Sequence, residues 1–524
     1  MKTLVSILIL LTFVASPAAE RTLLMVDDHE ILYRAGTRRV MENPVRHAKN
    51  PLITEDKPWE LAIGWTSVHR DKATGRYQLW YQAYAGPRAE LKTHECVVCY
   101  AESADGITFT KPDLGLFEFN GEKQTNIVLI GSGAYGHRYC NSMIVDPREA
   151  DAARRYKMLY YDWATQPNGE VWAGLHIAFS PDGVHWTKHP EAPLYRTSFG
   201  GKKVQPPFEG ENPYQETKLA DGRVKRQMIV PMSMSDAADP VFDPKRKVWA
   251  VYGKMWIQGP EGGLAWKHGM GRTESKDLLH WSKPQLVCAP DDRDGALEFH
   301  TSPVFYHGER FFSLNQILNR AGGGTMDIEL MTSRDGFEWE RPFRDRYFIA
   351  RSEGDTFDCG TILTNSDFII DGGEMRFYYG AYGSGAIGGG SNITSDTQKS
   401  GVGLVTLPLN RFAGIRSDPE APTPKIKSPP DIGQITFKPI DLKGRTELYV
   451  NANATGGAVW AEILDADGYR VRGFDKANCV PLKKKDSTRY RFSWKDKKLA
   501  DLPPGPHQIR LHLESATVYA ITMR

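Results

Sequence analysis

A short motif that recurs four times constrains the fold of this chain more than any other feature. Its pattern is Ser-x-Asp-(Gly/Leu)-x-x-(Trp/Phe), and basic residues and proline follow it closely. The four copies lie at 103–109, 180–186, 275–281 and 333–339. Serine and aspartate side chains hydrogen-bond to nearby backbone amides and glycine tolerates positive φ, so the motif predicts a tight turn whose aromatic residue packs between sheets. We call this motif the Asp box and expect it to be structural rather than catalytic.

Two strand-like runs precede each Asp box. The paired runs are 65–69 with 77–84, 142–146 with 156–161, 240–243 with 248–252, and 302–306 with 310–314. A fifth copy, at 361–364, 375–379 and 402–406, has no box. Alternating apolar runs joined by turn residues are antiparallel hairpins, and serial four-stranded units without helical periodicity predict a five-bladed β-propeller. A six-bladed propeller is the alternative if residues 22–60 form a blade, but we expect that stretch to close the ring.

Composition and charge agree with an all-β protein. Phe, Trp and Tyr make up 11% of the 524 residues, and there are 49 Gly and 33 Pro, which suits many short strands. The net charge of +2 gives no field that would attract nucleic acid or anionic lipid. Residues 1–19 have the charged, apolar and small-residue regions of a signal peptide. We therefore expect an exported protein, periplasmic or extracellular, with no transmembrane segment.

The chain divides into two predicted domains. We assign 20–418 to the propeller, 419–430 with its five prolines to a stiff linker, and 431–524 to a β-sandwich of short alternating strands. Trp460 and Trp494 of the sandwich could contact a glycan, although packing is the favoured role for both. The six cysteines are expected to be buried thiols, because the two of Cys96-Val-Val-Cys99 face opposite sides of a strand.

In a propeller, the residues that lead into the innermost strand of each blade converge on the central channel. Four of the five blades bring a carboxylate to that position: Glu60, Asp236 or Asp239, Glu298, and Asp358. Three aromatic residues could stack on sugar faces, namely Trp59, Phe299 and Phe357. Polar contacts to a substrate are expected from Arg138, Asn141, Asp239 and His300.

Carboxylates gathered in one pocket raise each other's pKa, so one can stay protonated while another is ionised. Glycosidic cleavage needs such a pair, an acid for the leaving oxygen and a partner that acts as base or nucleophile. The alternative for any one carboxylate is that it caps a turn. His300 could bind a hydroxyl group, help to hold a structural cation in the channel, or be purely structural. No cofactor is required.

The box at 275–281 and the hairpins around it resemble the five-bladed propeller glycosidases of glycoside hydrolase families 32, 43, 62, 68 and 117. The resemblance covers about residues 22–415, and the C-terminal sandwich is similar to the one appended in family 32. It implies a base or nucleophile Asp, a pKa-tuning Asp and an acid Glu on successive blades. Two family 32 motifs, Trp-Met-Asn-Asp-Pro-Asn and Arg-Asp-Pro, are absent. On this resemblance Glu298 is favoured as acid and Asp236 as base or orienting carboxylate, with Glu60 and Asp358 in the pocket.

Two other functions stay open. A sialidase would carry Asp boxes, but it needs six blades, three arginines and a Tyr-Glu pair, and Arg138 is the only arginine in the segments considered. A secreted sugar-binding propeller would keep the aromatic residues without an acid pair. The favoured function is hydrolysis of a polysaccharide or oligosaccharide by a secreted glycosidase whose partner is its carbohydrate substrate. The sequence leaves the oligomeric state open.

Overall fold

The computed structural model describes residues 20–133, 139–165, 167, 169, 171–196, 214–218, 224–228, 232–233, 238–257, 267–385, 399–418, 420 and 432–524. In this part of the chain the regular elements are β-strands and single 3₁₀ turns, which confirms the all-β prediction. The turns are η1 (Gly86–Arg88), η2 (Lys92–His94), η3 (Ala152–Arg154), η4 (Asp292–Asp294) and η6 (Leu499–Asp501). No helix among these residues has the length and apolar character needed to cross a membrane.

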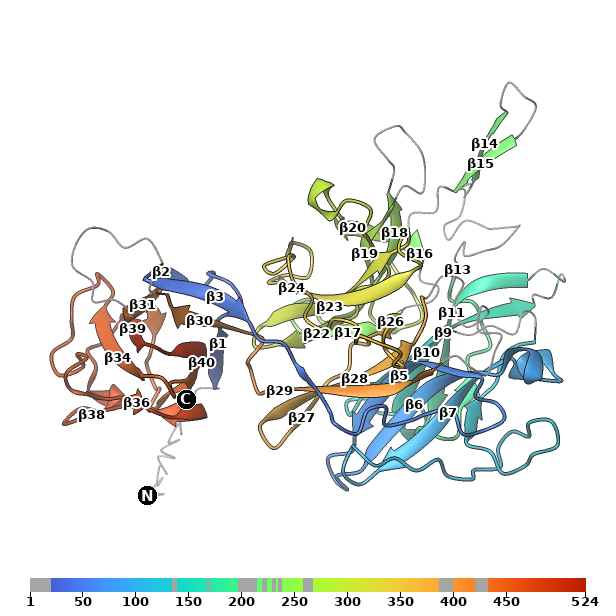
Figure 1. Ribbon diagram of the computed structural model, residues 1–524, viewed down its shortest axis with the longest axis horizontal. Helices are drawn as coiled ribbons and strands as arrows, with labels where there is room; N and C mark the ends of the chain where they lie inside the picture. Colours follow the sequence, from blue (N-terminus) through green and yellow to red (C-terminus); the bar gives the residue numbers. More distant parts are fainter. Residues whose placement is uncertain are drawn as a thin grey trace, which may run out of the picture. The chain divides into compact units, whose positions relative to one another are not determined.

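Five antiparallel units form the propeller, and each begins with its innermost strand (Figure 1). Blade one is β5 (Ala62–Arg70), β6 (Tyr77–Tyr84), β7 (Cys96–Ser103) and β8 (Ile127–Leu129). Blade two is β9 (Tyr139–Val145), β10 (Tyr156–Thr165), β11 (Val171–Ser180), β12 (Thr187–Lys188) and β13 (Tyr195–Arg196). Blade three is β16 (Met232–Ser233), β17 (Pro240–Asp243), β18 (Val248–Ile257), β19 (Lys267–Ser275) and β20 (Gln285–Cys288). The five-bladed prediction is confirmed.

Blades four and five complete the ring. Blade four is β21 (Glu298–Phe299), β22 (Val304–His307), β23 (Arg310–Asn319), β24 (Thr325–Ser333) and β25 (Trp339–Glu340). Blade five is β26 (Thr361–Leu363), β27 (Ile369–Asp371), β28 (Glu374–Tyr382), β29 (Ser400–Pro408) and β4 (Val45–Arg46). Since β4 comes from the N-terminal side of blade one and pairs with β29, the two ends of the propeller sequence close the ring together. A separate hairpin, β14 (Tyr214–Lys218) with β15 (Val224–Met228), lies between blades two and three in sequence.

The four Asp boxes are tight turns, as expected. In the first copy the Ser103 hydroxyl accepts from the Gly106 amide at 2.9 Å, and Asp105 Oδ1 accepts from two further amides. The carbonyl of the box glycine then accepts from an aromatic side chain of the preceding blade. These contacts are Tyr378 to Gly106 at 2.8 Å, Trp80 to Gly183 at 2.6 Å and Tyr252 to Gly336 at 3.0 Å. The boxes therefore join neighbouring blades.

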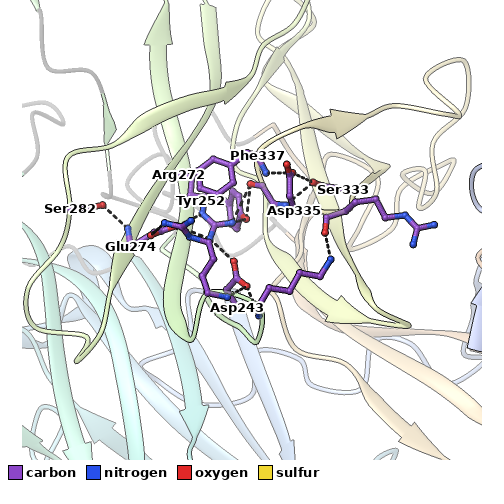
Figure 2. A network of polar contacts seen from close by, with 12 residues as sticks. Asp243, Tyr252, Arg272, Glu274, Ser282, Ser333, Asp335 and Phe337 are labelled. Atoms are coloured by element: carbon purple, nitrogen blue, oxygen red, sulfur yellow. Dashed lines mark hydrogen bonds and ion pairs between the residues drawn. The ribbon is translucent and has the colours of Figure 1, made fainter. Parts of the chain in front are cut away.

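The contact between blades three and four also carries a buried ion-pair network (Figure 2). The Arg272 guanidinium is almost fully buried and pairs with Asp243 at 2.7 Å and Glu274 at 2.8 Å. It also donates to the Tyr252 hydroxyl at 2.6 Å and lies 4.3 Å from the Phe337 ring centroid. Because every charge here has a partner, the network stabilises the contact between blades and leaves no group for chemistry.

A β-sandwich forms the second unit. One sheet is β3 (Thr37–Met41), β30 (Ala413–Ser417), β40 (Thr517–Met523), β33 (Leu448–Asn453) and β37 (Asp486–Arg491), with β1 (Arg21–Leu24) also on β40. The other is β2 (Ile31–Ala35), β31 (Ile432–Phe437), β39 (Pro506–Glu514), β34 (Ala458–Asp465) and β36 (Leu482–Lys483), with β32 (Ile440–Asp441) also on β39. A short pair, β35 (Cys479–Val480) with β38 (Ser493–Trp494), completes it. Trp494 is buried in the core between the sheets, in the packing role favoured from the sequence.

The domain boundary differs from the expected one. One compact unit is Met41–Leu409, and the other combines the described residues up to Val40 with those from Asn410 to Arg524. The strands β1, β2 and β3 were expected to close the ring, but they pair with sandwich strands. Strands of four or five residues carry too little alternation to show which sheet they will join. Most of the predicted linker 419–430, and residues 1–19, lie outside the described residues.

Candidate functional site

Blades three and four bring five polar side chains together at the end of the propeller where the inner strands begin. Glu298 starts β21, and His300 follows that strand. Lys254 lies near the end of β18, His268 near the start of β19, and Arg320 directly after β23. Second strands end and third strands begin at this same end of each blade, so meander topology alone puts these positions together. We call the five residues the channel-end cluster.

Glu298 is the centre of this cluster. Its side chain is 6% exposed, and its two oxygens have different partners. Oε2 lies 2.7 Å from His268 Nδ1 and accepts from the His268 amide at 3.1 Å, while Oε1 accepts from Arg320 Nε at 2.6 Å. Burial raises the pKa of the carboxyl, but the hydrogen bonds from His268 and Arg320 outweigh burial and lower the pKa to about 2. Glu298 is therefore ionised at neutral pH.

His268 is oriented by this carboxylate. Its side chain is 7% exposed, and burial lowers its pKa, so the imidazole is neutral near pH 7. With an ionised carboxylate 2.7 Å from Nδ1, the favoured tautomer has its proton on Nδ1 and its basic lone pair on Nε2. A carboxylate that fixes the tautomer of a neutral histidine is the arrangement that hydrolases use to hold a general base.

His300 connects the other members of the cluster. Its Nε2 lies 3.2 Å from Lys254 Nζ, and its Nδ1 lies 3.0 Å from Oε1 of Gln316. The Trp65 ring of blade one stacks on the imidazole with centroids 6.1 Å apart and planes 14° apart. His300 is half-buried, so a polar ligand at this end of the channel could reach it. Lys254, His268, Gln316 and Arg320 were missed in the sequence, because only the residues before inner strands were searched.

Asp239 lies in a separate polar layer with Asp367 of blade five. Asp239 is buried, and its Oδ1 accepts from the Ser142 hydroxyl at 2.6 Å. Burial raises the pKa of Asp239 to about 6. Burial and the nearby Asp239 charge raise the pKa of Asp367 to about 8. The described partners of Asp239 and of Glu298 are different residues, so the structure does not bring these two carboxylates into one hydrogen-bonded group.

Asp358 and Phe357 line a different pocket, between blade five and the N-terminal segment that closes the ring. This blade-five pocket has a volume of about 500 Å³ and also includes Arg46 and Lys399. Asp358 accepts from Arg46 Nε at 2.8 Å and from the Tyr379 hydroxyl at 2.9 Å. Burial raises the pKa of Asp358, but the Arg46 hydrogen bond outweighs burial, so the pKa is lowered. Asp358 thus anchors β4.

Glu60 and Trp59 do not reach the channel. Glu60 is 1% exposed, and its carboxylate accepts from the Tyr81 hydroxyl at 2.6 Å and Lys111 Nζ at 2.7 Å. Two backbone amides complete its partners. Trp59 is 1% exposed and donates to Asn126 Oδ1 at 3.1 Å. The predicted catalytic role of Glu60 and sugar contact of Trp59 are therefore corrected to roles in the interior of blade one.

Phe299 is also corrected to a core residue. It is 1% exposed and packs between blades three and four, with the Arg341 guanidinium 5.1 Å from its ring centroid. A ring so buried has no face for a sugar. Asp236 and Arg138 lie outside the described residues, and Asn141 lies on β9 without a described side chain. Their predicted roles stay predictions.

Neither a metal cluster nor a disulfide is found among the described side chains. They contain no group of three or more His, Cys, Asp or Glu that could hold a metal ion. Cys96, Cys99, Cys288, Cys359 and Cys479 are free thiols. Burial raises the pKa of Cys99 well above its ordinary value, as expected of an unreactive thiol.

Sequence comparisons find no relatives. No protein-family model matches the chain, and no curated protein matches it significantly. Solved structures resemble it at low identity. One described as a glycoside hydrolase shares 12% identity and a TM-score of 0.46, over 74% of this chain and 96% of the other. A Bombyx mori GH32 beta-fructofuranosidase shares 11% identity and a TM-score of 0.37 over 93% of both chains. An N-acetylgalactosamine deacetylase from F. plautii shares 18% identity and a TM-score of 0.38, over 72% of this chain and 97% of the other. At such TM-scores, function must be argued from this chain's own side chains.

Proposed function

We propose that this protein is a secreted hydrolase that cleaves a glycosidic bond of a carbohydrate at the channel-end cluster. The observation that carries the proposal is the buried, ionised Glu298 held between His268 and Arg320. A carboxylate kept ionised by its partners is the group that glycosidic cleavage needs as base or nucleophile. His300 lies two residues from Glu298 in sequence, and its half-buried imidazole can supply a polar contact for a sugar.

Glu298 takes the role of base or nucleophile in this proposal, not that of the acid. A general acid must carry a proton near the working pH, and Arg320 and His268 lower the pKa of Glu298 to about 2. The acid must then be another group at the same end of the channel. Asp236 lies outside the described residues and stays our candidate for it from the sequence, because Ser233, three residues before it, pairs with Lys254 of the cluster.

Replacing Glu298 tests the proposal directly. The purified protein is assayed for sugar release from plant and algal polysaccharides and aryl glycosides. We expect Glu298→Gln to lower kcat/KM by about 10³-fold, because it removes the ionised group but keeps the shape. Release that is equal for wild type and Glu298→Gln would contradict the site. Binding to a glycan in the panel without release by wild type would favour the sugar-binding alternative.

Glu329 supplies the matched control. It is a buried carboxylate of the same blade that accepts from Arg341 at 2.8 Å, and Arg341 is not a member of the channel-end cluster. Glu329→Gln therefore removes the same kind of ion pair, and we expect activity within about three-fold of wild type. An equal loss in both variants would indicate general destabilisation of blade four.

A second candidate function is favoured by the His268 geometry. A neutral histidine oriented by a carboxylate can activate water for attack on an ester or amide of a sugar. The same panel distinguishes the two reactions when it includes acetylated glycans. Release of acetate with no new reducing ends would identify de-acylation. New reducing ends would identify glycosidic cleavage.

A further inference from the structure

The sandwich unit has a polar cleft on the outer face of β34. Along β34 and β39, alternate residues such as Ile463 and Leu511 enter the core. Trp460 and Glu462 occupy the opposite face of β34. The chain that follows β34 forms the other wall and contributes Arg470, Arg472 and Lys476. The resulting Trp460 cleft has a volume of about 630 Å³.

Glu462 forms a neutralised floor for this cleft. Its side chain is 1% exposed, and it accepts from Arg470 Nε at 2.5 Å and pairs with His512 Nε2 at 3.0 Å. Burial raises the pKa of Glu462, but the His512 and Arg470 hydrogen bonds outweigh burial and lower the pKa. Because this carboxylate already has Arg470, Arg510 and His512 as partners, it adds little negative field at the mouth of the cleft.

The other carboxylate of the cleft is also engaged. Asp475 accepts from the amide of Ala477 at 3.0 Å, and its second oxygen accepts from Asn478 Nδ2 at 2.8 Å. These bonds hold the turn that carries Lys476. Among the described residues, Lys476 and Arg472 form no ion pair with either acid. Lys476 Nζ instead lies over the Trp460 ring, 4.3 Å from its centroid.

We propose that the Trp460 cleft binds an acidic sugar residue, a uronic acid or sulfated sugar, of a polysaccharide chain. The choice of a sugar rests on the proposed function of the propeller. The C–H face of a pyranose packs on a tryptophan ring, and its carboxylate or sulfate pairs with the Lys476 ammonium and the Arg472 guanidinium. Lys476 leaves the ring to make this pair. A cation–π contact at an exposed site is worth only about 0.5–1 kcal/mol, so its loss is readily offset.

The charge balance selects an acidic sugar over a neutral one. A neutral pyranose would displace Lys476 from Trp460 and offer it only hydroxyl groups. An acidic sugar replaces that contact with a charge-assisted hydrogen bond, which is roughly twice as strong as a neutral one. Arg472 is exposed at the same cleft and can form a second such bond.

The test is binding of the full-length Glu298→Gln protein to polygalacturonate, measured by calorimetry. The same polymer after chemical reduction of its carboxyl groups is the ligand control. We expect micromolar to millimolar binding that weakens at least five-fold from 50 to 500 mM NaCl. We expect the reduced polymer to bind at least ten-fold more weakly. Equal binding of both polymers would overturn the proposal.

Variants then locate the site. We expect Trp460→Ala, and separately the double variant Arg472→Gln/Lys476→Gln, to weaken binding at least ten-fold. Because the two cations are on the surface, the double variant keeps the fold even if Trp460→Ala does not. The matched control Lys438→Gln/Lys443→Gln removes two exposed lysines elsewhere in the sandwich and should change binding less than two-fold. Equal binding by the cleft variant and the wild type would overturn the proposal, as would equal binding to an acidic peptide or single-stranded DNA.

The result is separable from the proposed activity. Loss of binding in the cleft variants with unchanged cleavage of a small aryl glycoside would support both sites. Polygalacturonate binding by a wild-type protein that releases no sugar would support the Trp460 cleft and reject the proposed role of the propeller. Sugar release by a wild-type protein that does not bind polygalacturonate would support the propeller site and reject the Trp460 cleft.

Discussion

Leu278 occupies the position of the third Asp box where the other three copies have glycine. Its φ is 66°, in the left-handed region that costs a branched side chain about 1 kcal/mol. The side chain that the preceding blade presents to this box position is also different. Blades with a box glycine present a tyrosine or tryptophan donor to its carbonyl, but blade two presents Leu159, which packs with Leu278 in one buried cluster. An apolar pair thus replaces the aromatic–glycine contact.

Replacing Leu278 separates these two effects. Leu278→Gly relieves the backbone strain of about 1 kcal/mol but loses the burial of a side chain worth about 2–3 kcal/mol. We expect a net loss of about 1–2 kcal/mol in the free energy of unfolding of the propeller, measured by urea denaturation. Leu278→Gly that is as stable as wild type would show that the strain and the packing cancel.

Glu60 gives the second residue-scale prediction. Burial raises its pKa, and its four hydrogen-bond donors make it part of the interior of blade one. Glu60→Gln should lower the free energy of unfolding by about 1–3 kcal/mol, because it removes one of the two carboxylates that pair with the Lys111 ammonium, the other being Asp56 at 2.6 Å. The kcat of the folded variant, measured below its unfolding temperature, should equal that of wild type. A catalytic Glu60 would instead reduce kcat by orders of magnitude.

The fate of the four predicted carboxylates shows what the sequence can and cannot specify. The boxes and paired runs predicted each blade, because turn chemistry and strand alternation are local. Convergence in the channel is not local. Glu60 lies two residues before β5, whereas Glu298 is the first residue of β21, and Asp358 precedes β26 by three. Such offsets change both the height along the axis and the direction of the side chain. The end of the second strand and the start of the third strand are the positions that indicate Lys254 and His268.

At the scale of elements, β4 closes the ring with only two residues, so its attachment depends on side chains. Arg46 of β4 pairs with Asp358 at 2.8 Å in a site where the carboxylate is 2% exposed. We expect Asp358→Asn to lower the unfolding temperature of the propeller by about 4–8 °C, because it leaves a partly buried guanidinium without its charge partner. Differential scanning calorimetry measures this shift.

The exposed ion pair of Lys399 with Asp355 is the control for the ion pair of Arg46 with Asp358. Asp355 is 89% exposed, so screening by solvent makes its ion pair weak. Asp355→Asn should leave the unfolding temperature within about 1 °C of wild type. If Asp358→Asn behaves in the same way, β4 is held by its backbone pairing to β29 alone.

At the scale of the whole molecule, the carboxylates with shifted pKa values set the pH range of stability. Asp239 and Asp367 have folded-state pKa values of about 6 and about 8, above the ordinary value of 3.8. Their protonated forms are favoured in the folded state. Their stabilising contribution is complete below the ordinary pKa near 4 and is lost as the pH rises through 6 and 8. Glu298 acts in the opposite direction, since its lowered pKa contributes stability that is lost as the pH falls towards 2.

The balance predicts a stability maximum of the propeller between about pH 4 and 5, with a decline up to about pH 8. For Asp239, a rise of about two pKa units corresponds to about 3 kcal/mol between its two protonation states. Asp367→Asn mimics the protonated form, so it should flatten the decline between about pH 4 and 8 while changing stability little below pH 4. The measurement is urea unfolding of wild type and Asp367→Asn at each pH. A wild-type stability that rises from pH 5 to 9 would show that Asp239 and Asp367 are ionised in the folded channel, and that a cation or solvent compensates them.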